Sequence, residues 1–572
     1  MTLSRVRRVL HSPLTWVIGV AFLLRVIGLG WGLPASDGWD NDGIAPRDFL
    51  PGLVESFTPG HYFTYPPAHL ALLTLLTLPI TIVVAVRAPS TAPADIIAEA
   101  LKVPYMTSYS VVARLVSVVM SLGIVYAVGR LAEETAGKRA GVYAAAVCGA
   151  NVILTYYAHT TNLDVPYVFW ATLALLALTR TVARSEPRRL RQFAAFAALS
   201  IASKDQGYAL FVLGAPLALA SWALLDRWPR DNARAVAKEL VIGAAIGAAI
   251  LLVVDGALVN PSGFRARLAF LSGPASQPHA YYSADLAGRL RVLGDCAEHF
   301  GEHYPWAFAP LALVGLVRAA RQPRSAARAA ALVPMFAIVS FALAFNCVAR
   351  RTEHRFLMPQ MVLWAVYAGI GLDWLLAVRA RAPMWRGLVF ATTVTAFTFA
   401  LFRCAAVDAN MVLDPRYDTE AWLREHAAAG DVIEVHGNSV YLPRFPASAH
   451  VVRVGPEPAH GRNPILGAEE KEDALGNLAA RAPRFIVVSN GYAQHFLDDG
   501  GHQAPSFGRI RSAKQVATGT DADAATFFRQ LFAERLGYAR AHVSTWTSEL
   551  WPRLDIHGSL AEDVSIFERR LR

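Results

Sequence analysis

Long apolar stretches recur through the first 400 residues of the chain, with short polar segments between them. A helix of about 20 apolar residues crosses the hydrocarbon core of a bilayer, so this pattern predicts a mainly α-helical, polytopic membrane protein. The stretches lie at 14–33, 65–86, 111–129, 140–157, 165–179, 192–203, 207–225, 240–259, 305–317, 329–347, 356–378 and 387–406.

Beyond residue 407 the long apolar runs end, and His, Gly, Pro and charged residues return. Helical and extended patterns alternate there, which predicts a soluble α/β domain over 408–572 after a membrane domain over 1–407. Its expected helices are Asp418–Ala429 and Asp473–Arg481, and its expected strands are Val432–His436, Phe485–Ser489 and Val564–Arg569.

Charged residues make up 17% of the chain, against about 25% in typical soluble proteins, and the mean hydropathy is +0.34. These values exclude a disordered chain. A net charge of +10 could indicate a nucleic-acid partner, but no RNP, zinc-finger or helix-turn-helix pattern accompanies it, so none is expected. The four cysteines lack CxxC spacing and predict neither a metal site nor a disulfide framework.

Lys and Arg concentrate in five polar segments, which are therefore expected to face the cytoplasm: 130–139, 180–191, 226–238, 318–328 and 379–386. Alternation places outside the segments 158–164, 204–206, 260–304, 348–355 and everything after 407. We expect a bacterial inner (plasma) membrane protein with a cytoplasmic N-terminus and an extracytoplasmic C-terminal domain. A cleaved signal peptide is the alternative for the first stretch, but Arg25 interrupts the apolar run.

The stretch 65–86 does not fit this alternation. Because 111–129 must run inward to reach Arg130, all of 35–110 has to lie outside. We therefore expect eleven crossings, with 65–86 as an interfacial or re-entrant element or a broken hairpin. The competing interpretation makes 65–86 a full span and places the five basic segments outside, against the charge bias.

Acidic residues mark two outer segments. Asp40 and Asp42 follow the first crossing, and one could act as a general base toward an acceptor hydroxyl, or both could hold a divalent metal ion. A solvated acidic loop is the alternative. Asp164 is the only charged residue of its outer turn, where it could serve simply as a helix cap. Between these segments, Tyr65 precedes two prolines that suit the start of a helix.

Basic residues on the outer side are exceptions to the charge bias. Lys204 lies between two short apolar stretches, at a depth where charge indicates a functional site, although it could simply pair with Asp205. Arginines suit bidentate phosphate binding, and contact with lipid headgroups is their alternative role. The arginines of the last basic outer turn are Arg350, Arg351 and Arg355.

The outer loop 260–304 is long for a connection and is a candidate mobile lid. Its polar and aromatic residues are weak signals when taken one at a time. They are His279, Tyr281, Tyr282, Asp285 and His299.

The order of these motifs resembles the C-type (GT-C) integral-membrane glycosyltransferases, in particular the branch with protein O-mannosyltransferases and the bacterial aminoarabinose transferase of lipid A. The resemblance covers most of 1–406. The motifs that carry it are Leu24-Arg25…Gly32-Leu33-Pro34, Asp40 and Asp42, Tyr65-Pro66-Pro67, Arg114, Gly129-Arg130…Gly137-Lys138-Arg139-Ala140-Gly141, Asn162-Leu163-Asp164-Val165-Pro166, Ser203-Lys204-Asp205-Gln206-Gly207 and Arg355-Phe356-Leu357-Met358-Pro359.

The resemblance implies a sugar donor on a polyprenyl phosphate, membrane-surface helices in the first outer loop and a catalytic base in that loop. The base would be Asp42, with Asp40 as second choice, because this chain has Asp-Asn-Asp where the family often has Asp-Glu. Asp164 and Lys204 would correspond to the acid and the lysine of the next outer turns, and Arg355 would bind the lipid phosphate. No cofactor is certain, and a divalent metal ion stays open.

We therefore expect an inverting hexosyl- or pentosyltransferase that acts in the bilayer on a glycolipid, polysaccharide or protein acceptor at the outer face. The main alternative is a transporter or lipid flippase, which would place charges near the bilayer midplane and show internal repeats. A non-catalytic sensor or assembly factor, and an oligosaccharide ligase with a pyrophosphate-linked donor, are further alternatives.

Overall fold

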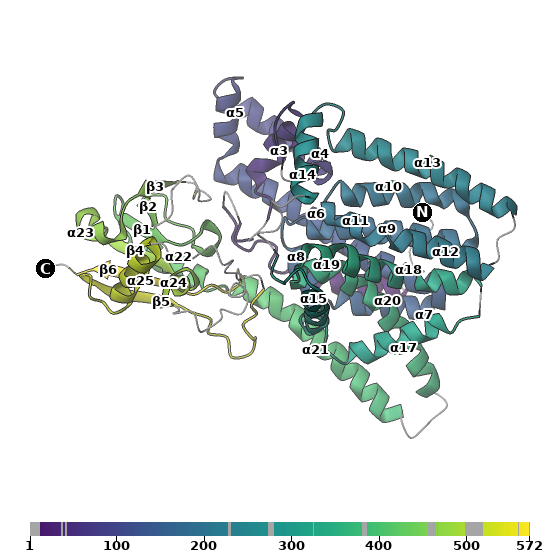
Figure 1. Ribbon diagram of the computed structural model, residues 1–572. Coiled ribbons are helices and arrows are strands. Elements are labelled where there is room, and N and C mark those ends of the chain that lie inside the picture. Colours follow the sequence, from purple (N-terminus) through teal and green to yellow (C-terminus); the bar gives the residue numbers. More distant parts are fainter. Residues whose placement is uncertain are drawn as a thin grey trace, which may run out of the picture. The chain divides into compact units, whose positions relative to one another are not determined.

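A computed structural model describes residues 12–35, 38–40, 43–63, 65–226, 230–272, 280–323, 325–379, 386–455, 465, 467–497, 519–556, 558 and 560–570 (Figure 1). The chain forms two compact units. The first comprises Met1–Leu29, Gly43–Ala100 and Ser108–Ala405, and the second comprises Gly30–Asp42, Leu101–Thr107 and Ala406–Arg572. The predicted fold class is confirmed, since the first unit is helical and apolar and the second contains a small sheet.

The first unit is built from helices. Their bounds are α2 (Pro13–Val26), α3 (Phe49–Phe57), α4 (Ala68–Arg87), α5 (Pro93–Ala100), α6 (Val103–Ala136), α7 (Lys138–Gly149), α8 (Val152–Ala158), α9 (Asp164–Arg184), α10 (Leu190–Ile201), α11 (Tyr208–Phe211), α12 (Gly214–Asp226), α13 (Arg230–Val254), α14 (Pro261–Ser272), α15 (Leu286–Glu298), α16 (Phe300–His303), α17 (Phe308–Ala320), α18 (Ala326–Phe341), α19 (Cys347–Ala349), α20 (His354–Arg379) and α21 (Arg386–Val412). Short turns of 3-10 helix lie at Pro46–Asp48, Pro187–Arg189 and Asp205–Gly207, and a π-helical turn, η5, covers Ala342–Asn346.

Within the described residues, eight helices are long and apolar enough to cross a membrane, or nine if the bent pair α7 and α8 is one span. Each of the eleven predicted crossings is helical. Three of them are shorter than a full span, because α2, α10 and α17 have 14, 12 and 13 residues.

The membrane helices pack closely. Figure 1 shows α9, α10 and α13 side by side, and α17 lies against α20. Glycines permit this last contact, since a Cβ atom at Gly315 would lie 1.8 Å from the carbonyl oxygen of Tyr367 and one at Gly371 would lie 2.0 Å from that of Leu311. Small residues at such crossings let helix backbones approach within the bilayer.

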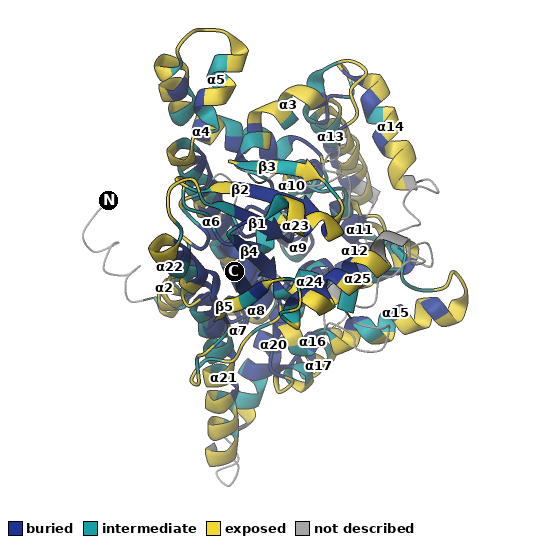
Figure 2. Ribbon diagram, turned by 90° about the vertical axis from the view of Figure 1, so that its left-hand side faces the viewer, coloured by how far each residue is buried: buried dark blue, intermediate teal, exposed yellow. Residues whose placement is uncertain are grey.

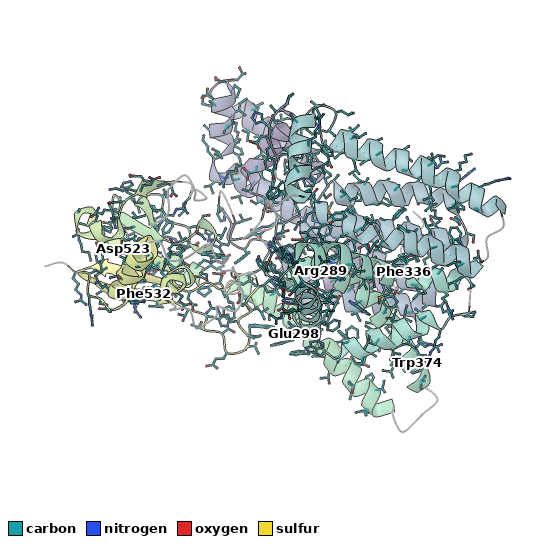
Figure 3. All side chains as sticks on the ribbon, viewed as in Figure 1. Arg289, Glu298, Phe336, Trp374, Asp523 and Phe532 are labelled. Carbon is teal, nitrogen blue, oxygen red and sulfur yellow. The ribbon has the colours of Figure 1, made fainter. Side chains whose placement is uncertain are left out.

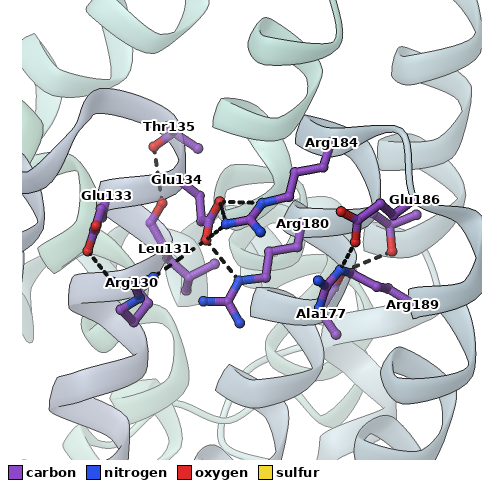
Figure 4. A network of polar contacts seen from close by, with 11 residues as sticks. Arg130, Leu131, Glu133, Glu134, Thr135, Ala177, Arg180, Arg184, Glu186 and Arg189 are labelled. Carbon is purple, nitrogen blue, oxygen red and sulfur yellow. Dashed lines mark hydrogen bonds and ion pairs between the residues drawn. The ribbon is translucent and has the colours of Figure 1, made fainter.

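Four of the five basic segments, or residues next to them, are linked at one end of the first unit. Glu134 of α6 accepts hydrogen bonds from Arg180 and Arg184 of α9, at 2.9 and 2.7 Å (Figure 4). The remaining links are Arg191–Glu239 at 2.6 Å, Arg139–Asp373 at 3.2 Å and the Gln322 amide to the Thr135 carbonyl at 3.1 Å. These links hold four of the segments together, most of the segment 379–386 lies outside the described residues, and the side of the membrane that the segments face stays a prediction.

Helix α4 is one continuous helix, so the broken hairpin predicted as one option for 65–86 is wrong. The Ala68 amide donates to the Ala202 carbonyl, and the hydroxyls of Thr81 and Tyr109 are 3.0 Å apart. Tyr109 lies about 31 Å along α6 from Arg130, at 1.5 Å per residue. Both halves of α4 thus contact the end of the unit away from the basic segments. This agrees with a membrane-surface helix, although its length and composition alone would permit a span.

The second unit contains a six-stranded sheet of order β3-β2-β1-β4-β6-β5. Strands β3, β2, β1 and β4 are parallel, and β6 and β5 are antiparallel to their neighbours. The bounds are α22 (Arg416–His426), β1 (Val432–His436), β2 (His450–Gly455), β3 (Ala468–Glu472), α23 (Leu478–Arg481), β4 (Phe485–Ser489), α24 (Asn490–Leu497), α25 (Gly519–Phe532), β5 (Tyr538–Ser544) and β6 (Val564–Arg569), with 3-10 turns at Ser439–Tyr441 and Leu475–Asn477.

The three predicted strands are confirmed as β1, β4 and β6, and α22 confirms the amphipathic helix. The predicted helix Asp473–Arg481 is wrong in extent, because only a 3-10 turn and the four residues of α23 are helical. Every residue of β4 is buried, as the dark ribbon in Figure 2 shows. One face of the sheet packs on Phe527 and Phe528 of α25, and the other packs on Leu423 of α22.

Candidate active site

A buried ion pair joins two of the predicted outer turns. Asp164, the first residue of α9, is fully buried, and the Lys204 ammonium donates to its Oδ1 at 2.6 Å. The expected Lys204–Asp205 pair is wrong, because Asp205 pairs with Arg267 instead. The helix-cap role considered for Asp164 is also wrong, because the position before α9 is Leu163 and no side chain caps the helix.

Asp164 keeps unused bonding capacity. Its Oδ2 is buried, and no described residue donates a hydrogen bond to it. Tyr65 lies within electrostatic reach, since burial and then the Asp164 carboxylate raise the pKa of its hydroxyl. The Ala68–Ala202 hydrogen bond holds the start of α4 beside the Lys204 turn. Asp164, Lys204 and Tyr65 therefore lie close together, as residues of a single site must.

Three cations surround one aromatic ring. Lys204 Nζ lies 6.0 Å from the centroid of the buried Phe356 ring, and the guanidinium carbons of Arg351 and Arg355 lie 4.6 and 4.7 Å from it. The cations come from turns about 150 residues apart. We call Lys204, Arg351, Arg355 and Phe356 the cation cluster. Cations over an aromatic face are attracted to it, but they still repel one another.

One carboxylate holds the two arginines of the cation cluster. Glu353 accepts from Arg355 Nε at 3.0 Å and lies 3.5 Å from Arg351 Nη2. Glu353 and Asp164 are thus described carboxylate partners of the three cations. The cations themselves are partly buried, where solvent screens their attraction for a phosphate less than it does at the surface.

The predicted lid residues contact the basic turn. The Tyr281 amide donates to the Arg350 carbonyl at 2.9 Å, and the Arg350 guanidinium donates to the Tyr282 carbonyl at 3.0 Å. Arg351 donates to the Tyr281 hydroxyl at 3.2 Å. Figure 3 shows α15, with Arg289 and Glu298, following this segment. His279 lies outside the described residues.

The turn that carries these arginines has an irregular backbone. The π-helical turn η5 ends at Asn346, which is buried and donates to the Arg351 carbonyl at 3.2 Å. Arg350 then adopts a left-handed conformation with φ of 51°. Such π-turns are frequent at functional sites. The extra residue in the turn shifts the positions of the side chains that follow it along the helix.

A second charged group lies beside the Lys204 turn. Arg267 of α14 is buried, pairs with Asp205 and lies 3.9 Å from Asp255. Burial raises the pKa of Asp255 to about 6, against the attraction of Arg267. Asn260 donates to the His61 carbonyl and accepts from the Gly60 amide. These contacts fix the first outer loop against the region after α13.

The first acidic pair belongs to the second unit as far as it is described. Asp40 is buried there, and Asp42 lies outside the described residues. Ile44, two residues after Asp42, exchanges hydrogen bonds with Thr161 of the Asp164 turn. Among the described residues no three His, Cys, Asp or Glu side chains gather as metal ligands. A metal ion at Asp40 and Asp42 stays a prediction.

Sequence reasoning missed Glu353, Phe356, Arg267 and Asp255. Glu353 lies inside the basic motif, so its opposite charge was the available signal. Phe356 stands in the motif Arg355-Phe356-Leu357-Met358-Pro359, but as an apolar residue at the start of a membrane helix it suggests no role of its own.

Parts of this chain are similar to known proteins in sequence or in fold. A family model described as dolichyl-phosphate-mannose-protein mannosyltransferase matches residues 105–255, and no curated protein matches the chain. ArnT from Cupriavidus metallidurans bound to undecaprenyl phosphate is 16% identical, with a TM-score of 0.50, and the match covers 84% of this chain and 94% of that one. Archaeal oligosaccharyltransferase AglB from Archaeoglobus fulgidus, in complex with an inhibitory peptide and a dolichol-phosphate, is 12% identical, with a TM-score of 0.41 over 97% of this chain and 88% of that one.

The likeness to ArnT shows the fold of this chain. The predicted resemblance to the GT-C membrane glycosyltransferases is thereby confirmed at the level of architecture: a polytopic helical unit and a smaller C-terminal sheet unit.

Proposed function

We propose that this chain, which has the GT-C fold, is a membrane glycosyltransferase that moves a sugar from a polyprenyl phosphate to an acceptor hydroxyl at the extracytoplasmic face. The cation cluster beside the buried Asp164–Lys204 pair carries the proposal. A polyprenyl-phosphate donor is supported by the undecaprenyl phosphate bound to ArnT and by the name of the matching family model.

The charge of the cation cluster fits the leaving group. When the bond between the anomeric carbon and the phosphate oxygen breaks, the electron pair leaves with the phosphate and its negative charge grows. Lys204, Arg351 and Arg355 would stabilise that charge more in the transition state than in the ground state, which is what accelerates the step. Arg350 would complete the phosphate-binding group, and Tyr281 and Tyr282 would cover it.

The acceptor chemistry requires one base. The acceptor oxygen forms a bond to the anomeric carbon from the face opposite the phosphate, so a single displacement inverts that carbon. Its proton passes to a carboxylate, for which we propose Asp42, with Asp40 as the second choice. Asp164 would hold the Lys204 ammonium in place and offer its Oδ2 to the substrate. Tyr65 would line the same neighbourhood.

The test uses the full chain in lipid nanodiscs. A panel of undecaprenyl-phosphate-linked hexoses and aminopentoses is added with a bacterial membrane-lipid extract as the acceptor source. Release of undecaprenyl phosphate and the mass of the glycosylated product are measured. We expect turnover with at least one donor. Movement of a donor across proteoliposome membranes without release of undecaprenyl phosphate would instead establish a flippase.

The base assignment has its own test. Asp42→Asn should lower kcat by about 100-fold or more, as removal of a general base does. Asp48→Asn is the matched control, because Asp48 is exposed and belongs to the same acidic loop. Full kcat in Asp42→Asn would refute the assignment, and a loss in Asp40→Asn alone would move the role to Asp40.

A further inference from the structure

The acidic segment Gly30–Asp42 belongs to the same compact unit as the C-terminal sheet, although almost 400 residues separate them in sequence. Two of its tryptophans, Trp31 and Trp39, are buried within this unit. Trp39 immediately precedes Asp40 and lies three residues before Asp42. Whatever holds Trp39 therefore limits where the Asp40 carboxylate can lie.

The start of α22 holds this segment. The Trp31 indole donates to Asp414 Oδ2 at 2.9 Å, and the Gly32 amide donates to the Tyr417 hydroxyl at 3.1 Å. The Arg416 guanidinium lies 3.9 Å from the centroid of a Trp39 ring. A Cβ atom at Gly32, whose φ is +69°, would come within 3.0 Å of the Trp39 ring, so the approach is close on that side as well.

Arg416 itself is fixed from every side. It is fully buried, and its Nε and Nη2 donate to the two oxygens of Asp414 at 2.8 and 2.6 Å. Its Nη1 donates to the Val440 carbonyl at 2.6 Å. A buried ion pair of this kind is weak evidence for stability, because desolvation offsets much of its attraction. Its geometry instead specifies one arrangement of the groups that it contacts.

We propose that Arg416 is a positioning residue: held by Asp414 and stacked on Trp39, it fixes Trp39 and with it Asp40, the residues that directly precede the proposed base. The inference rests on the proposed function for its catalytic consequence. It assigns the first turn of α22 a part in the reaction, although no atom of Arg416 touches substrate.

The test compares two buried arginines of the same unit. Arg416→Lys keeps the charge but loses the planar fork and the stacking face. Arg453→Lys is the matched control, because Arg453 of β2 is equally buried and pairs with Glu470 at 2.8 Å, away from the acidic segment. Both full-length variants are assayed in nanodiscs with the undecaprenyl-phosphate-linked sugar that the wild type uses, and amide hydrogen exchange is followed over residues 31–40.

Arg416→Lys should lower kcat by about 10- to 100-fold with the donor KM within twofold, since misplacing a catalytic group by about 1 Å has such an effect. Amides of 31–40 should exchange at least tenfold faster, and Arg453→Lys should change neither quantity. A wild-type kcat in Arg416→Lys, an equal loss in both variants, or unchanged exchange would overturn the proposal. If the wild type turns over no donor, the proposed function fails, and the exchange rates alone decide whether Arg416 holds the segment.

Discussion

The two ends of the helical unit use the same residue types in different ways. At the end with the basic segments, Arg139, Arg184 and Arg191 are between 42% and 65% exposed, and each has a carboxylate partner. At the other end, the side chains of Lys204, Arg351 and Arg355 are only 13% to 20% exposed, and all three lie around one aromatic ring.

This difference separates a topological role from a chemical one. Exposed ion pairs contribute about 0–1 kcal/mol each, and solvent and salt screen them. Partly buried cations are screened less and attract an anion more strongly. A count of arginines cannot distinguish the two ends, whereas the burial of their side chains can.

Removal of one cation from each end should give the largest contrast. Lys204→Met should lower kcat/KM by about 100- to 1,000-fold, because it removes a charge that stabilises the leaving phosphate and leaves Asp164 unpaired. Arg184→Met should change it less than twofold. Both are measured as release of undecaprenyl phosphate, with chromatographic behaviour as a check of folding. Similar losses in the two variants would abolish the distinction between the ends.

The second largest effect should be on the affinity for the lipid phosphate, when one arginine of the cation cluster is removed. Arg355→Met should weaken the Kd for undecaprenyl phosphate in nanodiscs by about 10- to 30-fold, the effect of losing one charge-assisted hydrogen bond. Arg191→Met is the matched control at the opposite end. If Arg355→Met binds like the wild type, the phosphate does not contact the cation cluster.

A substitution of Glu353 should raise the affinity for the lipid phosphate instead of lowering it. Glu353→Gln keeps an oxygen that accepts from Arg355 and raises the net charge of the cluster by one, so undecaprenyl phosphate should bind a few-fold more tightly. Glu133→Gln, which removes one of the two carboxylates near Arg130 at the other end, should have no effect on binding. Weaker binding in Glu353→Gln would show that the carboxylate is needed to orient the arginines.

The smallest expected effect is a pH dependence confined to the end with the cation cluster. The pKa of Asp255 is raised to about 6 from 3.8, so the folded state binds its proton more tightly than the unfolded state does. This group's contribution to stability therefore falls as pH rises from about 4 to about 6 and is constant above. Relative to Asp255→Asn, the wild-type Tm should fall by about 2–4 °C over that interval. An equal pH profile in the two proteins would contradict the prediction.

The sequence predicted most of what depends on local pattern. Apolar run length indicated the membrane helices, and β4 reads as a nearly continuous apolar run because a central strand is buried on both faces. Strand β3, with the sequence Ala-Glu-Glu-Lys-Glu, lies at the sheet edge and carries no such pattern. It was missed for that reason.

The sequence predicted the charged residues of the candidate site but not their partners. Lys204, Asp164 and the arginines could be selected because charge is rare in outer turns beside membrane helices. Their partners could not, since Lys204 pairs with a residue 40 positions away and Asp205 with one 62 positions away. The hydrogen bond between Trp31 and Asp414 joins residues 383 positions apart, and no local sequence pattern indicates it.

Helix α10 is short, so on the proposed function bilayer thickness would affect how the lipid donor reaches Lys204. Its 12 residues rise about 18 Å, against a hydrocarbon core of about 30 Å. It begins beside the Arg191–Glu239 pair, and Lys204 follows its end. A lipid phosphate that reaches Lys204 must therefore leave its usual depth, or the bilayer must thin around the protein at a fraction of a kcal/mol per Å. Shorter acyl chains would reduce that deformation, so on the proposed function the thickness of the surrounding bilayer would affect how easily the donor phosphate reaches Lys204.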